Sequence, residues 1–156
     1  KVFVIIIMKK EKASSPKDIL KRLHAIFRRT GERIIIGDKS SQQIYYVDPD
    51  SLMYIDAVQN YTNWFFSDGT KIMPNCQLHE CEELISNQIS EDAITLARVG
   101  RSNIVNLKYI AQLDMAKREI VISNRRNFSE RISVSEESIK QLKEATLLYK
   151  ESNENE

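Results

Sequence analysis

The strongest constraint on the fold is a series of short runs rich in Ile, Val, Tyr and Phe that begins near Arg33 and is broken repeatedly by turn residues. Short β-branched and aromatic runs bounded by turn residues are typical of strands in an antiparallel sheet. We expect these strands at residues 33–36, 43–47, 52–57, 61–66, 70–73, 93–99, 110–114 and 119–123. Ser67-Asp68-Gly69 predicts a hairpin between the fourth and the fifth of them. The chain is therefore predicted to be mainly β with some helix, in the α+β class.

Three segments have the apolar spacing of helices. The first follows Ser14 or Ser15 as N-cap, has Pro16 at its first position and ends before Gly31. Its apolar stripe consists of Ile19, Leu20, Leu23, Ile26 and Phe27, and basic side chains cover the rest. A basic amphipathic helix of this kind either packs its stripe on a neighbouring element or lies on a membrane or a phosphate backbone.

The second and third helices are predicted from caps and apolar spacing. Asn75 can cap a helix over residues 76–87, and Ser133 or Ser135 can open the last one. The residues expected to point inward are Leu78, Leu84 and Ile85 in the second helix, and Ile139, Leu142, Ala145 and Leu148 in the third. Residues 150–156 contain no apolar side chain, and we expect this acidic tail to fray.

A chain of 156 residues has about the length of one domain. We expect residues 33–149 to form it, preceded by residues 1–32, which hold a strand or linker and the basic helix. The longest apolar run, Val2 to Met8, is too short to cross a bilayer and is expected to be a buried strand; the stub of a membrane helix or of an upstream domain is the alternative. Two cysteines fit a reducing compartment, so we expect a cytoplasmic protein unless an N-terminal segment tethers it to a membrane.

The formal net charge of +1 hides an uneven distribution along the chain. Residues 1–33 carry 10 basic and 3 acidic side chains, whereas residues 34–97 carry 2 and 10. Residues 98–131 are basic again, with 8 against 3, and residues 132–156 have 3 against 6. This pattern suggests one face suited to an anionic partner, with chance clustering on solvated faces as the alternative.

Cysteine and histidine lie close together in one place, at Cys76, His79 and Cys81. On a helix Cys76 and His79 would share a face and Cys81 would point elsewhere, whereas a structural zinc site needs four converging ligands. A small hydrolase that uses Cys76 and His79 is an alternative that rests on their proximity alone, because the pattern offers no orienting third group. We therefore expect no catalytic activity, no metal and no cofactor.

The signature of LytTR-type DNA-binding domains is similar to one stretch of the chain, Ala97-Arg98-Val99-Gly100-Arg101-Ser102-Asn103-Ile104-Val105-Asn106-Leu107-Lys108-Tyr109-Ile110. Three other features resemble the family and follow in its order: residues 51–57, Asn60-Tyr61 with the turn at residues 67–69, and residues 132–135 before Leu142. Over residues 33–149 the resemblance implies elongated antiparallel β-sheets with short helices. It also implies that loops at strand ends, rather than a recognition helix, contact double-stranded DNA.

The residue chemistry around Gly100 fits such contacts. A sharp turn there would leave guanidinium groups projecting at a strand end, and arginine suits bidentate contact with a phosphate or a guanine edge. We expect Arg101 to contact bases or phosphates, and Ser102 to hold phosphate. Arg98 is expected to hold the DNA backbone or an internal partner, and Asn106 to make a local bond in a turn.

The resemblance places a second DNA-facing element at residues 59–63. In it Asn60 and Asn63 could pair with adenine edges, and Tyr61 could hold a phosphate. The alternative is a polar turn in which only Tyr61 is half-buried.

The chain departs from the family pattern in two places. Glu136 and Glu137 stand where basic residues often follow the last strand, and they can instead favour the N-terminus of the last helix. Gly100 and Asn103 stand where a histidine and an aromatic residue are common.

Arg125 and Arg126, in a long turn, are expected to compensate by holding phosphate, so that replacing both would flatten the salt dependence of binding. Lys108 is expected to hold the DNA backbone as well. We thus expect the output domain of a bacterial transcriptional response regulator, which binds repeated half-sites as pairs. An upstream receiver or membrane segment would supply the input. A non-catalytic protein-interaction module on the same β scaffold is the alternative, favoured by the near-neutral charge.

Overall fold

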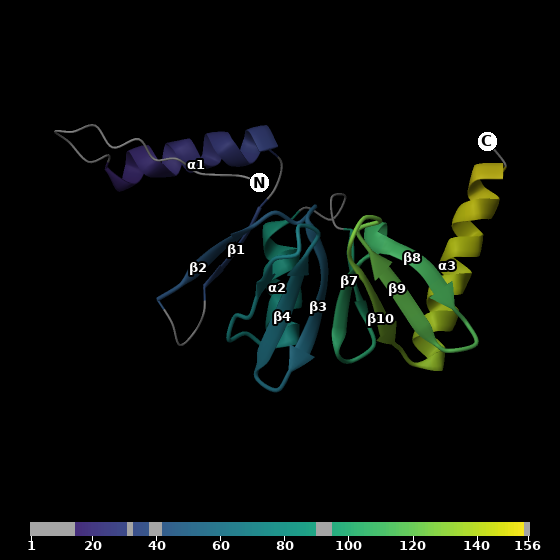
Figure 1. The fold of residues 1–156 in the computed structure, drawn as a ribbon. Coiled ribbons are helices and arrows are strands. Elements are labelled where there is room, and N and C mark those ends of the chain that lie inside the picture. Colours follow the sequence, from purple (N-terminus) through teal and green to yellow (C-terminus); the bar gives the residue numbers. More distant parts are fainter. Residues whose placement is uncertain (1–14, 31–32, 38–41, 90–94, 155–156) are drawn as a thin grey trace.

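The computed structural model describes residues 15–30, 33–37, 42–89 and 95–154, with the side chains of residues 24–30 left out. Within this part of the chain, antiparallel sheets lie side by side in an elongated molecule, with helices around them (Figure 1). The strands are β1 (Ile34–Gly37), β2 (Ile44–Val47), β3 (Leu52–Val58), β4 (Tyr61–Phe66), β5 (Lys71–Ile72), β6 (Leu96–Val99), β7 (Asn103–Asn106), β8 (Ile110–Asp114), β9 (Glu119–Ser123) and β10 (Ser129–Ser133). The helices are α1 (Pro16–Thr30), α2 (Leu78–Gln88) and α3 (Glu136–Glu154). No helix in the described ranges is both long and apolar enough to traverse a lipid bilayer.

The predicted class, mainly β with some helix, is confirmed, and the predicted strands are present with small shifts at their ends. Of the strand predicted at residues 93–99, the described part is β6. Strand β7 was not predicted from the residue pattern, because only four residues separate the turn at Gly100 from the short 3₁₀ helix Leu107–Tyr109. The apolar run from Val2 to Met8 lies outside the described residues.

The central five-stranded sheet, in the order β5-β4-β3-β7-β6, is buried on both faces. On one face Ile55 lies opposite Trp64 and Ile104, and these side chains form a core with the inner face of α2. On the other face Tyr54 lies opposite Phe65 and Val105 and belongs to a second core. Burial on both faces explains why β3 and β4 are almost continuously apolar in sequence.

The second core joins the central sheet to the three-stranded sheet β10-β9-β8 and to α3. Ile120 and Ile122 of β9 are fully buried in it, and Leu142 of α3 packs against it. The hairpin of β1 and β2 joins the first core instead. The side chain of Gln88, at the end of α2, donates to the carbonyl of Ile35 at 2.9 Å and accepts from its N–H at 2.7 Å, which covers backbone groups of β1.

Two of the three predicted helix starts are confirmed. The Ser15 side chain accepts from the N–H of Asp18 at 3.2 Å, and the Ser135 side chain accepts from the N–H of Ser138 at 3.1 Å. The start of α2 differs from the prediction: the N-cap is Gln77 rather than Asn75, and the Gln77 N–H donates to Glu80 Oε2 at 2.9 Å.

Two of the predictions of inward-pointing residues are wrong. Ala145 and Leu148 are exposed, because α3 leaves the body of the molecule after its first turns (Figure 1) and its later residues have no sheet to pack on. Cys81 was expected to point away from the face that carries His79, and it is fully buried whereas His79 is exposed. The helix continues to Glu154, where a frayed tail was expected from residue 150.

Candidate nucleic-acid interface

Two turns that were predicted to face DNA meet at one end of the central sheet. They are the β3–β4 hairpin, with Gln59 and Asn60 at its tip, and the β6–β7 turn of residues 100–102. The backbone links them directly, because the N–H of Ala57 donates to the carbonyl of Ser102 at 2.9 Å. Gly100 takes a left-handed conformation with φ of 69°, which suits glycine.

Two further segments extend this end of the molecule. The start of α3 lies against the β6–β7 turn, since a Cβ on Gly100 would be 3.8 Å from Ser138 Oγ. A groove of about 560 Å³ separates the two, lined by Val99, Gly100, Arg101, Ser102, Asn103, Ser133, Val134, Ser135, Glu137 and Ser138. The β8–β9 turn joins the start of α3 through a hydrogen bond of 3.0 Å from the N–H of Val134 to the carbonyl of Arg118. We call residues 59–60, 100–102, 117–118 and 135–138 together the hairpin rim.

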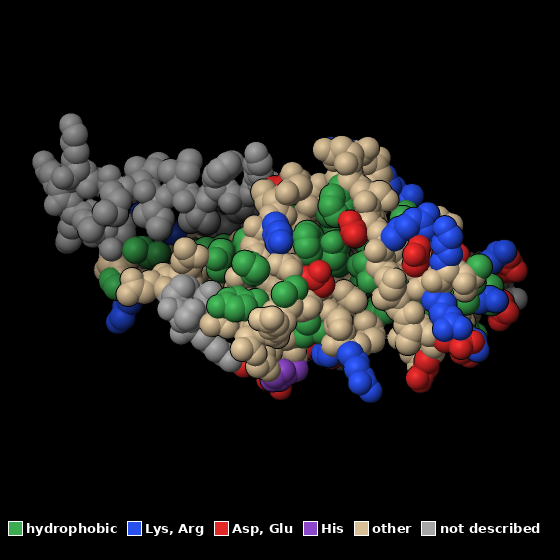
Figure 2. Space-filling view, turned by 60° about the horizontal axis from the view of Figure 1, so that its bottom comes forward, with side chains coloured by type: hydrophobic (Ala, Val, Ile, Leu, Met, Phe, Trp, Pro, Cys, Tyr) green, Lys and Arg blue, Asp and Glu red, His purple; other side chains and the backbone are tan. Residues whose placement is uncertain are grey.

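Arg101 is an exposed cation of the hairpin rim. Its side chain is exposed and makes no hydrogen bond or ion pair within the described part of the chain. Ser102 is exposed beside it, and Lys117 is exposed on the β8–β9 turn. Figure 2 turns this end toward the viewer and shows basic and acidic side chains intermixed over the right half of the surface. The rim therefore offers free donors without a strong net charge.

Arg98 has a different environment from Arg101. Its Nε donates to the carbonyl of Gly100 at 3.0 Å, and its Nη2 donates to the carbonyl of Arg101 at 2.8 Å. Its Nη1 pairs with Glu82 Oε2 of α2 at 2.8 Å. The guanidinium is thus engaged inside the fold, and of the two roles expected for Arg98 the geometry favours the internal one.

The β3–β4 hairpin presents only part of its predicted set. Asn60 is exposed and Tyr61 is 42% exposed. Asn63 is only 7% exposed, and its Oδ1 is buried without a hydrogen-bond partner in the described structure. Since Asn63 points between the sheets, it does not extend toward a ligand outside the rim.

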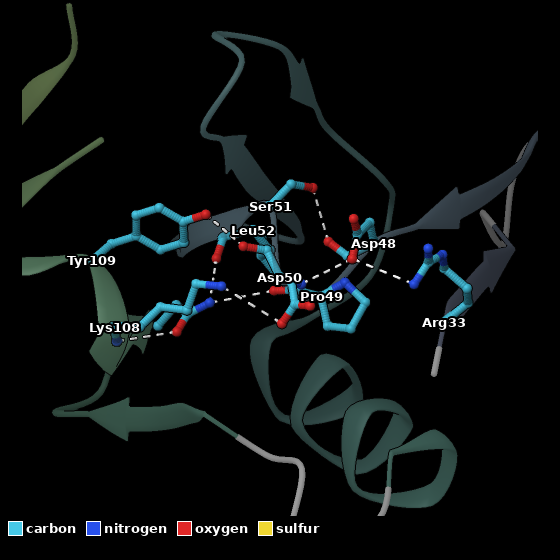
Figure 3. Close-up of polar contacts among 9 residues, drawn as sticks. Arg33, Asp48, Pro49, Asp50, Ser51, Leu52, Lys108 and Tyr109 are labelled. Atoms are coloured by element: carbon cyan, nitrogen blue, oxygen red, sulfur yellow. Dashed lines mark hydrogen bonds and ion pairs between the residues drawn. The ribbon is translucent and has the colours of Figure 1, made fainter. Parts of the chain in front are cut away.

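Three predicted contacts lie at the other end of the strands. Lys108 follows β7 at the end away from Arg101; its Nζ is 3.6 Å from Asp50 Oδ1 and 5.4 Å from the centre of the Tyr109 ring. Figure 3 shows this group, in which the Tyr109 hydroxyl donates to the carbonyl of Asp50. The buried Asn106 ties the same turn to the sheet, with Nδ2 donating to the carbonyls of Leu52 at 2.8 Å and Pro49 at 3.3 Å. Its Oδ1 accepts from the N–H of Lys108, so the local bond expected for Asn106 is confirmed.

Arg125 and Arg126 belong to this second end as well. They sit in the β9–β10 turn, where Asn124 Oδ1 accepts from three successive N–H groups and Asn124 Nδ2 donates to the carbonyl of Ser67 at 3.0 Å. Ser67 follows β4, so the turn lies about one strand length, roughly 20 Å, from the hairpin rim. We call residues 48–52, 67, 106–109 and 124–128 the network end. The structure does not bring its basic residues together with Arg101.

Sequence reasoning missed the basic residues of the β8–β9 turn. Arg118, with φ of 54°, pairs with Glu136 Oε2 at 3.6 Å, and Glu136 also contacts Lys140 at 3.0 Å. The hydrogen bond from Lys140, its charge and that of Arg118 lower the pKa of the Glu136 carboxyl below its usual value. The available signal was two basic residues between two predicted strands inside the basic segment 98–131.

The cysteine and histidine cluster is not arranged as expected. Cys76 precedes α2, so helical spacing does not relate it to His79; Cys76 and Cys81 are both buried, with their sulfurs 3.5 Å apart, and His79 is exposed. The hydrogen bond with Cys81, together with burial, raises the pKa of the Cys76 thiol and makes it a poor nucleophile. Within the described ranges no group of three or more His, Cys, Asp or Glu side chains could hold a metal ion.

Comparison with known proteins identifies a family for most of the chain. The family model of the LytTr DNA-binding domain matches residues 42–146. Among solved structures, a LytTr DNA-binding domain of a Bacillus cereus protein described as a methyl-accepting/DNA response regulator aligns with a TM-score of 0.52 and 19% identity, over 73% of this chain and 95% of that one. No curated protein matches the chain at a significant level. The matched residues run from β2 into α3 and include every segment of the hairpin rim, and the chain belongs to the LytTR family of DNA-binding domains.

Proposed function

We propose that this protein binds double-stranded DNA sequence-specifically through the hairpin rim. The observation that carries the proposal is the state of Arg101: in a LytTR domain, an exposed arginine whose side chain has no partner among the described residues stands on a turn at a strand end. A free guanidinium fork suits the acceptor edge of guanine in the major groove.

The other exposed residues of the rim, together with the adjacent Tyr61, divide between base and backbone contacts. Asn60 and Tyr61 extend the contact surface from the neighbouring hairpin, where an amide can pair with adenine and a phenol can hold a phosphate. Ser102 and Lys117 would hold phosphates. Each phosphate neutralised releases counterions, so affinity falls as salt rises.

In the cell the domain would act as the output of a bacterial transcriptional regulator in the cytoplasm. Family membership supports this role. A second copy would bind the next half-site through the same loops. A receiver domain or a membrane segment on the N-terminal side of the DNA-binding domain would supply the regulatory input.

Selection of bound sites from random duplexes tests the proposal. We expect enrichment of a defined motif and elution from heparin at a salt concentration above that of the Arg101→Ala variant. A protein-interaction module would instead enrich no motif and would show no difference between the two proteins on heparin.

A further inference from the structure

The side chain of one arginine, Arg98, is hydrogen-bonded to the backbone of the β6–β7 turn. The three donor nitrogens of Arg98 bind three different acceptors, two of which are the consecutive carbonyls of Gly100 and Arg101. Each of these hydrogen bonds has a charged donor, which makes it stronger than a neutral one. Arg98 therefore determines the path of the backbone that presents Arg101.

Arg98 is in turn oriented by helix α2. Glu82 contributes the third acceptor at 2.8 Å, and the adjacent Cys81 is fully buried against the central sheet. The helix backbone at Glu82 is thus fixed by packing, whereas the carboxylate itself is about half exposed, at 49%. The contact connects a rigid helix to an exposed turn across 16 residues of sequence.

We propose that Glu82, which lies outside the DNA-contacting rim, is a positioning residue for base recognition: it holds Arg98, and Arg98 shapes the turn that carries Arg101. This inference rests on the function proposed above. When Glu82 is removed, Arg98 loses its fixed orientation and the turn samples other conformations. Contacts with bases need one geometry and weaken, whereas attraction to phosphates needs only charge and persists.

Electrostatics alone gives the opposite sign. Glu82→Gln removes a negative charge from a DNA-binding protein, which by itself raises affinity for any duplex. A fall in specific affinity would therefore report positioning and not charge. Glu83→Gln is the matched control, because Glu83 is an exposed neighbour on the same helix with the same charge and no ion pair among the described residues.

The experiment measures affinity by fluorescence anisotropy for two probes, a duplex recovered from the random-sequence selection and a scrambled duplex of equal composition. For Glu82→Gln we expect the ratio of the two affinities to fall about five- to tenfold, part of the discrimination given by one bidentate base contact. Glu83→Gln should leave the ratio unchanged. Arg98→Lys keeps the charge but cannot form the fork, and it should reproduce the loss.

Amide hydrogen exchange without DNA provides a second readout. The amides of residues 99–103 should exchange faster in Glu82→Gln than in Glu83→Gln, at equal thermal stability. If the two variants behave alike in exchange and in affinity ratio, Glu82 does not position the turn. If the wild-type protein itself shows no preference between the duplexes, the proposed function is wrong and the binding part of the inference falls with it. The exchange measurement still shows whether Glu82, through Arg98, restrains the backbone of the turn.

Discussion

The two ends of the central sheet carry similar side chains and use them differently. At the network end, Lys108 faces Asp50 and Tyr109, and Asn106 is buried with both ends of its amide bonded to backbone. At the hairpin rim, the side chains of Arg101 and Asn60 are exposed and make no hydrogen bond or ion pair in the described part of the chain. At the network end the polar groups are bonded within the fold, whereas at the hairpin rim they remain available to bind a partner.

This difference shows that the number of basic residues in a segment does not by itself identify a DNA-binding surface. Residues 98–131 place arginines at both ends, and the sequence offers no means of separating them. A cation contributes to recognition only when its internal partners leave donors unused, and this depends on long-range contacts.

The largest effect should come from breaking the network end. Asn106→Ala removes three hydrogen bonds from a fully buried side chain, and the carbonyl of Leu52 loses the donor that lies 2.8 Å from it, whereas the carbonyl of Pro49 still accepts from the N–H of Leu52. We expect the free energy of unfolding to fall by about 3 kcal/mol, measured by urea denaturation. Asn60→Ala at the hairpin rim is the matched change and should cost less than about 0.5 kcal/mol. Equal losses would show that the two ends do not differ as the structure indicates.

The second effect concerns binding and appears at the hairpin rim. Arg101→Ala should weaken binding to the selected duplex by about 1–3 kcal/mol, because a base-contacting guanidinium is lost. Its stability should stay within about 0.5 kcal/mol of the wild type, since the side chain is exposed and makes no hydrogen bond or ion pair with any described residue. A gel-shift titration measures the first quantity. Unchanged affinity would remove Arg101 from the interface.

Much of the fold was accessible from sequence because its signals are local. Caps such as Ser15 and Ser135 bond residues three positions away, and apolar runs identify strands without reference to their partners. The family signature also located the turn with Arg101. What sequence could not provide were partners at long range: Glu82 for Arg98, 16 residues apart, and Leu52 for Asn106, 54 residues apart.

The same limit explains why the predicted contact set divides. Asn63 lies between the fully buried Thr62 and Trp64 on a strand that is covered on both faces, and only the packing of the second sheet shows that a polar side chain on this strand is buried as well. Lys108 and the arginine pair follow strands whose direction is set by sheet topology, and they therefore reach the end opposite Arg101.

A smaller effect on DNA affinity is expected from replacing Glu136, whose carboxylate forms ion pairs with two cations near the hairpin rim. Glu136→Gln releases Arg118 and Lys140, so affinity for any duplex should rise a few-fold and the salt slope should steepen by about 1. Protonation of the Glu136 carboxyl also removes its negative charge and should therefore raise the affinity for DNA as well. The folded pKa of Glu136 lies below its ordinary value, so its contribution to stability is present above the unfolded pKa and is lost as pH falls through the folded one. Affinity measured between pH 7 and about 4 should therefore rise more in the wild type than in Glu136→Gln.

The smallest effect sharpens the comparison most directly. If Arg125 and Arg126 held phosphates, replacing both by alanine would reduce the salt slope of binding by about 1.8. Their place at the network end, about one strand length from the rim, leads us to expect a change well below that value and unaltered affinity for the selected duplex. The variant should fold normally, because Asn124 and not the arginines holds the turn, and alanine at residue 125 meets the same left-handed backbone as arginine. A slope reduced by nearly 2 would mean that the duplex contacts both ends of the sheet, and the division between a structural end and a binding end would not hold.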